Sequence, residues 1–140
     1  MAIKMRVLCS GKKKLQVLAN NIKAKYELDF NAVDVIPPAY SCDKERIVIL
    51  AISAKGANGI SDSLRLFCGE LTKARAQNVA LVINGDEAAA NAVKAILTEA
   101  GTNVVDEVFY IGAGLFSFKP SAQELQDTYA WVDRVIANLK

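Results

Sequence analysis

Ile47-Val48-Ile49-Leu50-Ala51-Ile52 is the stretch of sequence that decides the fold. Every residue of this run is apolar, so a strand formed here is apolar on both faces. Such a strand is typical of a parallel sheet that helices cover on both sides. Residues 79–83 are a second fully apolar run. The two runs therefore predict buried strands within an α/β domain.

Shorter strand-like runs alternate with helical patterns in the rest of the chain. We expect a first strand at residues 5–9, a second at roughly 27–36 that ends at Pro37, and a last strand at 108–111. The connection after the second strand is too short for a long helix. The alternation predicts one domain, residues 1–140, with a five-stranded, doubly wound parallel sheet and helices on both faces.

Four helices are predicted from apolar residues that recur every three or four positions. The second begins after Ser61, which offers an N-cap, and the third runs from about Asp86 to Gly101. The fourth opens with Ser121 and Glu124 as a capping box. The side chains expected to face inward are Leu15, Leu18, Ile22 and Tyr26 in the first helix, Leu64, Phe67 and Leu71 in the second, Val93, Ile96 and Leu97 in the third, and Leu125, Tyr129, Val132, Ile136 and Leu139 in the fourth.

Composition restricts the class of protein. With 52% hydrophobic residues, the chain is not expected to be disordered, and its net charge of +2 gives no electrostatic argument for binding nucleic acid or a membrane. The absence of histidine excludes His-based acid–base catalysis and most transition-metal sites. Cys9, Cys42 and Cys68 fit neither a disulfide framework nor a zinc site. Their odd number, without a signal-peptide or membrane-span pattern, predicts a cytoplasmic protein.

The loops that follow the strands are the expected ligand site, because open parallel sheets bind ligands beyond the carboxyl ends of their strands. This rule selects residues 10–14, 53–62, 84–86 and 112–117. Glycines in these loops permit tight turns and close approach of a ligand to the backbone. They occur as Gly56 and Gly59 around Asn58, as Gly85 between Asn84 and Asp86, and as Gly112 and Gly114.

The first of these loops, Ser10-Gly11-Lys12-Lys13-Lys14, places three lysines where a helix begins. Cations are unfavourable at a helix N-terminus, which carries partial positive charge. The run therefore indicates a bound anion such as a phosphate, with a merely solvated turn as the alternative.

The loops after the third and fourth strands resemble those of the flavodoxin family. The resemblance lies in Ser53-Ala54-Lys55-Gly56-Ala57-Asn58-Gly59 with the helix that follows, and in Asn84-Gly85-Asp86. It implies a strand order of 2-1-3-4-5, an FMN cofactor and an electron carrier with redox protein partners rather than an enzyme. Carried over to this sequence, the phosphate would be held by Ser10, Gly11, Lys12 and Lys13, and the ring would be flanked by Ser53, Gly56, Asn58, Gly59, Asn84, Gly85 and Asp86.

The sequence departs from the family in two places. Lysines replace the Ser and Thr residues of the family's phosphate loop, and residues 53–62 and 84–86 contain no Trp, Tyr or Phe to stack on the flavin. Phe116 and Phe118 follow the last strand and are interpreted as core residues. These departures predict a flavin site that is altered or lost.

Two other functions remain open from the sequence. Cys9-Ser10-Gly11 resembles the phosphocysteine loop of the lactose/cellobiose-type IIB sugar phosphotransferase components, which implies a phosphoryl-transfer protein with Cys9 as the nucleophile. The alternative interpretation of Cys9 is a small buried apolar residue at the end of a strand. A non-catalytic module for another phosphorylated ligand is the second. Asp86 is interpreted as a helix N-cap rather than a catalytic acid. Trp131, one position off the apolar stripe of the last helix, is expected at the sheet edge or in a dimer contact.

Overall fold

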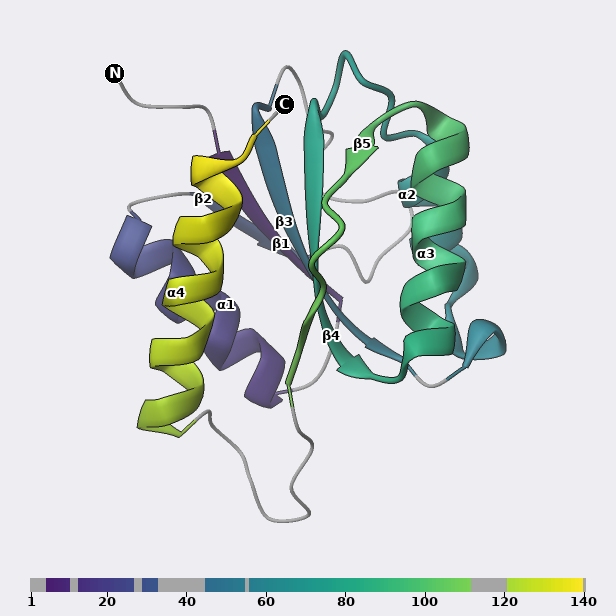
Figure 1. The fold of residues 1–140 in the computed structure, drawn as a ribbon. Coiled ribbons are helices and arrows are strands. Elements are labelled where there is room, and N and C mark those ends of the chain that lie inside the picture. The colour runs from purple at the N-terminus through teal and green to yellow at the C-terminus, as the bar shows by residue number, and fades with distance from the viewer. Residues whose placement is uncertain are drawn as a thin grey trace.

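Two central strands organise the fold, β3 (Ile47–Ala54) and β4 (Asn78–Gly85), and they contain the two fully apolar runs (Figure 1). The computed structural model describes residues 5–10, 13–26, 29–32, 45–54, 56–111 and 121–139. The first six residues of each central strand are buried, and all of them are apolar except Asn78, whose side-chain amide donates to the carbonyl of Arg46 at 3.0 Å. The other elements are β1 (Met5–Ser10), α1 (Lys13–Tyr26), β2 (Asp29–Ala32), the 3-10 turn η1 (Ala57–Gly59), α2 (Asp62–Gly69), α3 (Glu87–Ala100), β5 (Asn103–Val104), β6 (Phe109–Tyr110) and α4 (Ala122–Ala137).

All described strand pairs are parallel, and the strands lie in the order β2-β1-β3-β4-β5. This order confirms the one that the sequence predicts. β2 as described lies within the predicted 27–36. Residues 27–28 and 33–44, which include Pro37, lie outside the described residues. Because β1 lies between β2 and β3, the chain reverses its direction of winding at β1.

The fifth position of the sheet is occupied by two short strands instead of the one predicted at 108–111. β5 pairs with the start of β4, and β6 pairs with its later part. β4 advances from Val79 to Val82 while its partner advances from Val104 to Phe109, so the partner segment contains extra residues. Such an excursion leaves backbone groups without strand partners. One of them is satisfied by the indole N–H of Trp131, which donates to the carbonyl of Glu107 at 2.8 Å.

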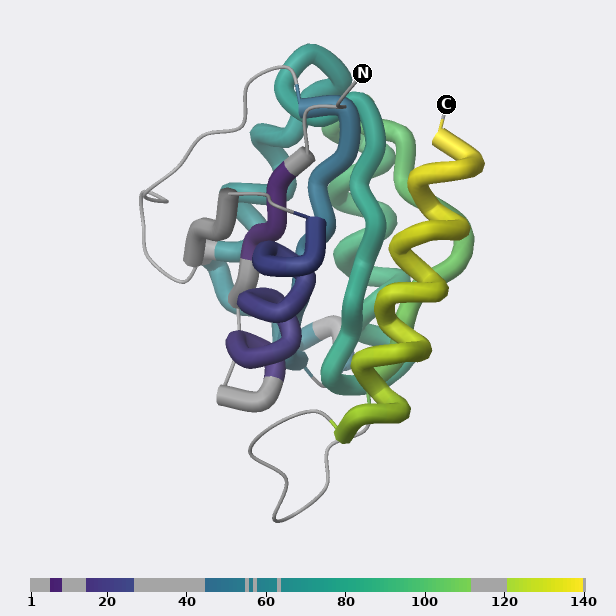
Figure 2. The backbone as a smooth tube through the Cα atoms, turned by 90° about the vertical axis from the view of Figure 1, so that its left-hand side faces the viewer, coloured from purple at the N-terminus to yellow at the C-terminus, as the bar shows by residue number. Residues whose placement is uncertain are grey.

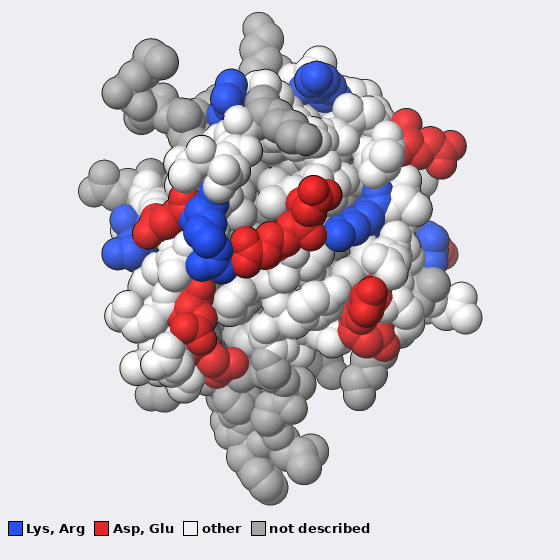
Figure 3. All heavy atoms as spheres, in the orientation of Figure 1, with Lys and Arg blue, Asp and Glu red and all other residues white. Residues whose placement is uncertain are grey.

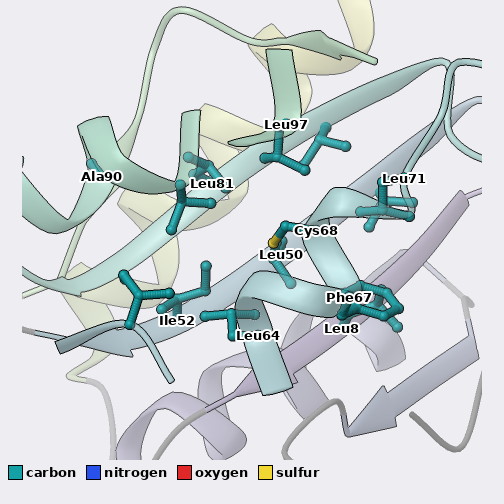
Figure 4. Close-up of a cluster of buried hydrophobic side chains, with 14 of the residues drawn as sticks. Leu8, Leu50, Ile52, Leu64, Phe67, Cys68, Leu71, Leu81, Ala90 and Leu97 are labelled. Atoms are coloured by element: carbon teal, nitrogen blue, oxygen red, sulfur yellow. The ribbon is translucent and has the colours of Figure 1, made fainter. Parts of the chain in front are cut away.

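Helices cover both faces of the sheet, as predicted. α1 and α4 lie side by side over one face, and α2 and α3 lie over the other (Figures 1 and 2). The first pair is joined by the hydroxyl of Tyr26, which donates to the Tyr129 carbonyl at 3.0 Å and to Asp133 Oδ1 at 2.8 Å. Under the second pair, side chains from α2 and α3 pack on those of the central strands (Figure 4).

The predicted N-caps and the predicted end of α3 are confirmed, whereas Leu71, predicted in the second helix, lies beyond the end of α2 at Gly69 and is buried. Ser61, Asp86 and Ser121 are N-caps, and Ser121 with Glu124 forms both bonds of the capping box. Gly101 ends α3 with φ of 111°, a left-handed conformation that glycine adopts without a steric cost.

The predicted buried face of α4 is wrong in its centre. The side chains that are buried are Thr128, Trp131, Val132 and Val135, while Leu125, Ile136 and Leu139 are only partly buried. Trp131 is fully buried and its ring lies 5.7 Å from that of Phe109 in β6. The expectation of Trp131 at the sheet edge is therefore confirmed, and the alternative of a dimer contact through Trp131 is wrong, because its side chain has no exposed surface.

Candidate ligand site at the carboxyl edge of the sheet

The sequence-predicted loops after β1, β3 and β4 meet at one edge of the sheet, the lower edge in Figure 1. The register places Ser10 beside Ile52, Ser53 beside Asn84, and Ala54 beside Gly85. The carboxyl ends of β3 and β4 and the turns that follow them therefore form one surface. It consists of residues 53–54, 56–62 and 84–87. Gly11, Lys12, Lys55 and residues 112–120, which include Phe116 and Phe118, lie outside the described residues.

Gly56 and Asp86 join the two central loops. The N–H of Gly56 donates to both carboxylate oxygens of Asp86, at 2.9 and 3.1 Å. Gly56 has φ of 69°, in the left-handed region that favours glycine, and its carbonyl accepts the N–H of Gly59 at 3.1 Å. Asp86 also accepts the N–H of Ala89 at 3.0 Å as the N-cap of α3. One carboxylate therefore fixes the turn after β3 to the start of the helix after β4.

Gly85 is required by packing rather than by a ligand. A Cβ atom built on it lies 1.7 Å from the carbonyl oxygen of Ala54 on the neighbouring strand. No side chain fits there unless the ends of β3 and β4 separate. Gly59 differs, because a Cβ there meets only ordinary contacts of 3.7 Å or more with Ala54.

Three polar side chains lie at this edge: Ser53, Asn84 and Asn58. Ile52 and Ile83 belong to the core under α2 and α3, so strand alternation turns Ser53 and Asn84 to the face of α1 and α4. Both are half-buried at the strand ends, and Asn58 in η1 is exposed. These three side chains offer hydrogen-bonding groups to a ligand that spans the edge.

The first turn of α1 differs from those of the other described helices. The first turns of α2, α3 and α4 contain Asp62, Glu87 and Glu124, whereas the first turn of α1 as described contains no acidic residue. Lys13 is its first residue and follows the end of β1 at Ser10 across residues 11–12. An anion is therefore repelled least at the β1–α1 turn.

Tyr110, which the sequence reasoning did not include, lies at the same edge of the sheet. It is 46% exposed at the carboxyl end of β6, beside Ile83 of β4. Partial burial, followed by the negative charges of Glu87 and Asp86, raises the pKa of its phenol. The run Val108-Phe109-Tyr110-Ile111 gave an apolar strand signal, and a tyrosine as its third residue, just before a glycine-containing loop, was the available clue.

Comparison of the sequence with protein-family models and with curated proteins gives no match. Comparison of the structure with solved structures does give matches over almost the whole chain. Oxidised flavodoxin 1 from Bacillus cereus superimposes with a TM-score of 0.67 at 15% identity, covering 97% of this chain and 98% of that one. The chain has the flavodoxin fold.

Two further structures agree. The flavodoxin of Streptococcus pneumonia TIGR4 matches with a TM-score of 0.65 at 14% identity, covering 97% of this chain and 99% of that one. A short-chain flavodoxin associated with a non-canonical PDU bacterial microcompartment matches with a TM-score of 0.65 at 11% identity, covering 98% of each chain. These matches confirm the predicted flavodoxin-like architecture.

The Cys9 alternative gains no support from these neighbours, which are all flavodoxins. Cys9 also does not end its strand, since β1 continues to Ser10. Among the described helices, none has the length and apolar character needed to cross a bilayer.

Proposed function

We propose that this chain is a flavodoxin-like protein that binds FMN at the carboxyl edge of its sheet and exchanges electrons with redox protein partners. The observation that carries the proposal is the match to three flavodoxin structures over 97–98% of the chain. In this fold the ligand site is the crevice at the switch point of strand order. Here the switch point lies beside β1 and β3, where the β1–α1 turn and the Gly56 turn begin.

The phosphate end of FMN fits the α1 side of this edge. The β1–α1 turn contains Ser10, Gly11, Lys12 and Lys13, and the described first turn of α1 has no acidic residue to repel a phosphate. The first turn of α3 is unsuitable, because the Asp86 carboxylate already occupies its N-cap and Glu87 follows. An anion bound at α1 gains from the helix dipole and from the lysine charges.

The flavin ring fits the loops after β3 and β4. Gly56 and Gly59 keep the backbone open to close approach of a ring. Asn58, Ser53 and Asn84 supply donors and acceptors toward the ring edge and the chain that links ring to phosphate. Asp86 holds the Gly56 turn in place before a ligand arrives. FMN, when bound, supplies the electron-accepting ring, and the protein contributes binding and orientation.

The test is titration of the purified protein with FMN, followed through quenching of flavin fluorescence. We expect saturable binding of FMN and competition by inorganic phosphate. Lys13→Ala should weaken FMN binding about fivefold, which corresponds to one charge-assisted contact.

Lys23→Ala is the matched control, since Lys23 lies in the last turn of the same helix. It removes the same charge far from the carboxyl edge and should leave FMN binding unchanged. A protein that ignores FMN contradicts the proposal. If phosphate alone binds, the edge serves another phosphorylated ligand.

A further inference from the structure

A cavity of about 400 Å³ lies between the segment from β5 to β6 and the last turns of α4. β5 pairs with the first residues of β4, so this cavity lies toward the amino edge of the sheet, the upper edge in Figure 1. The proposed flavin site is at the opposite edge. Small-molecule sites in proteins have volumes of about 300–1,000 Å³, so the cavity is large enough for a ligand of its own.

One wall of the cavity is fixed to α4 at two points through Glu107, which lies in the interruption between β5 and β6. The carbonyl of Glu107 accepts the indole N–H of Trp131 at 2.8 Å. Its carboxylate accepts Nε and Nη2 of Arg134 at 3.2 and 2.6 Å. Because these bonds exist before a ligand arrives, binding does not have to order the wall, and the entropic cost of binding is reduced.

Two asparagines that line the cavity have a fixed amide orientation. Nδ2 of Asn78 donates to the carbonyl of Arg46 at 3.0 Å, so Oδ1 of Asn78 is the atom that accepts Nδ2 of Asn103 at 2.8 Å. Nδ2 of Asn138 donates to the carbonyl of Arg134 at 2.7 Å. A carbonyl only accepts, so neither amide can turn over. Asn103 and Asn138 therefore each have Oδ1, an acceptor, left for a ligand.

The charged residues that line the cavity are Asp106, Glu107 and Arg134, and together they carry a net charge of −1. The Arg134 guanidinium is engaged by both carboxylate oxygens of Glu107. In the described part of the chain, the Asp106 carboxylate forms no ion pair. Lys94 donates to the backbone carbonyl of Asp106 at 3.4 Å and does not line the cavity. The polar groups left for a ligand are therefore mainly acceptors with negative charge.

We propose that this cavity binds a small amine, with its ammonium group on the carboxylate and amide oxygens and its apolar body against Val104, Val105 and Val135. An ammonium group has three donors and no acceptor, which complements these oxygens. A carboxylate ligand would instead be repelled by Asp106 and would have to displace Glu107 from Arg134. The inference goes beyond the proposed function and concerns the other edge of the sheet.

The experiment titrates the full chain with n-pentylamine, 1-pentanol and pentanoate, which share one alkyl chain and differ in the charge of the head group. Binding is followed through the NMR shifts of the backbone amides. We expect pentylamine to shift amides within residues 103–107 and 134–138, with a Kd of about 1 mM. Pentanol should bind at least about fivefold more weakly, and pentanoate more weakly still. If pentanoate binds there as tightly as pentylamine, or if no probe shifts these amides, the proposal is overturned.

Three variants test the charges. Asp106→Asn should weaken binding of pentylamine about threefold to fivefold and leave pentanol unaffected. Asp62→Asn is the matched control, because it removes the same charge in the first turn of α2, outside the cavity. Lys94→Ala removes a cation beside Asp106 and should not weaken binding of the amine.

Two results with these variants contradict the proposal. If Asp106→Asn binds pentylamine as tightly as the wild type does, the charge of the cavity does not hold the amine. If Lys94→Ala weakens binding, the cavity prefers anions. Thermal unfolding of each variant checks that a loss of affinity is not a loss of fold. Failure of the amine to bind leaves the proposed function standing, because the FMN titration tests the carboxyl edge.

Discussion

Gly85 shows how closely two strand ends can approach when one of them lacks a side chain. Replacing it by alanine places a Cβ where the Ala54 carbonyl oxygen stands, at 1.7 Å, so β3 and β4 must separate. We expect Gly85→Ala to lower the free energy of unfolding by about 2–4 kcal/mol in urea denaturation. Gly69→Ala is the control, because a Cβ there meets nothing within 4 Å, and it should be neutral or stabilising by up to about 1 kcal/mol. Equal effects of both substitutions would refute the packing argument.

Asp86 has two separable roles, as the N-cap of α3 and as the acceptor for Gly56. Asp86→Ala removes both and should cost about 2–3 kcal/mol of unfolding free energy. Ser61→Ala removes only an N-cap, the bond from the Leu64 N–H, and should cost about 1 kcal/mol. Amide exchange of Gly56 should accelerate in Asp86→Ala and not in Ser61→Ala. Unchanged exchange at Gly56 would show that the turn holds without the carboxylate.

The candidate site could be predicted from the sequence only as far as local rules extend. The capping role of Asp86 follows from its position before a helix, and the structure confirms it. Its bond to Gly56 joins residues 30 apart in the chain, so it depends on the register of β3 and β4, which no local pattern encodes. Tyr110 was missed for a similar reason. The apolar run at residues 108–111 predicts a strand, but it does not show whether a residue of an outer strand such as Tyr110 faces a helix or solvent.

At the scale of elements, the central strands were easier to predict than the edge. β3 and β4 are buried on both faces and give continuous apolar runs. The fifth position lies at the end of the sheet, where β5 and β6 are two residues each and the segment between them leaves the ladder. Trp131 fills the adjoining space, and this draws Thr128 and Val135 of α4 into the buried face. The predicted buried face of α4 was derived only from the spacing of apolar residues, and this spacing contains no information about a contact with a neighbouring strand.

Trp131 should therefore stabilise the interrupted strand specifically. Trp131→Phe removes the indole donor to the Glu107 carbonyl and part of a fully buried ring, which should cost about 2–3 kcal/mol. We expect faster amide exchange at Val105 and Ile111, whose N–H groups donate to Val79 and Ile83 of β4.

Val132→Ala is the control for this effect. It makes a cavity in the same helix face without touching the Glu107 bond, so it should destabilise the whole domain while leaving the pattern of exchange unaltered. A similar acceleration at Val105 and Ile111 in both variants would mean that Trp131 has no special role at the edge.

For the molecule as a whole, the pattern of strands and helices constrains the fold more than it constrains the ligand. This chain shares its fold with flavodoxins that are only 11–15% identical in sequence. Apolar residues in the strands and on the buried faces of the helices can be exchanged for other apolar residues of similar volume without changing the fold. A site depends on a few side chains, and a fold alone does not fix them. On the face shown in Figure 3, acidic and basic side chains are interspersed, in keeping with a net charge of +2. Among the described residues of this face, long-range charge therefore favours no partner of one sign.

The stability of the whole domain should fall in alkaline solution because two weak acids, the buried thiol of Cys68 and the partly buried phenol of Tyr26, retain their protons in the folded state. Burial raises the pKa of the Cys68 thiol, which lies among Leu50, Phe67 and their neighbours (Figure 4), from the ordinary 9.0 to about 12. Burial, and then the hydrogen bond to Asp133, raises the pKa of Tyr26 above its ordinary 10.0. In the unfolded chain both groups ionise at lower pH, so rising pH favours unfolding.

The pH window follows from these values. Cys68 contributes no pH dependence below pH 9, and from pH 9 to 12 its effect approaches about 1.4 kcal/mol of unfolding free energy per pH unit. Urea denaturation under reducing conditions at several pH values measures the slope. Cys68→Ala should flatten it, whatever its stability at pH 7, and Tyr26→Phe should flatten it further above pH 10. If Cys68→Ala leaves the slope between pH 9 and 10 unchanged, the thiol ionises without unfolding and the core around α2 admits water more readily than its packing indicates.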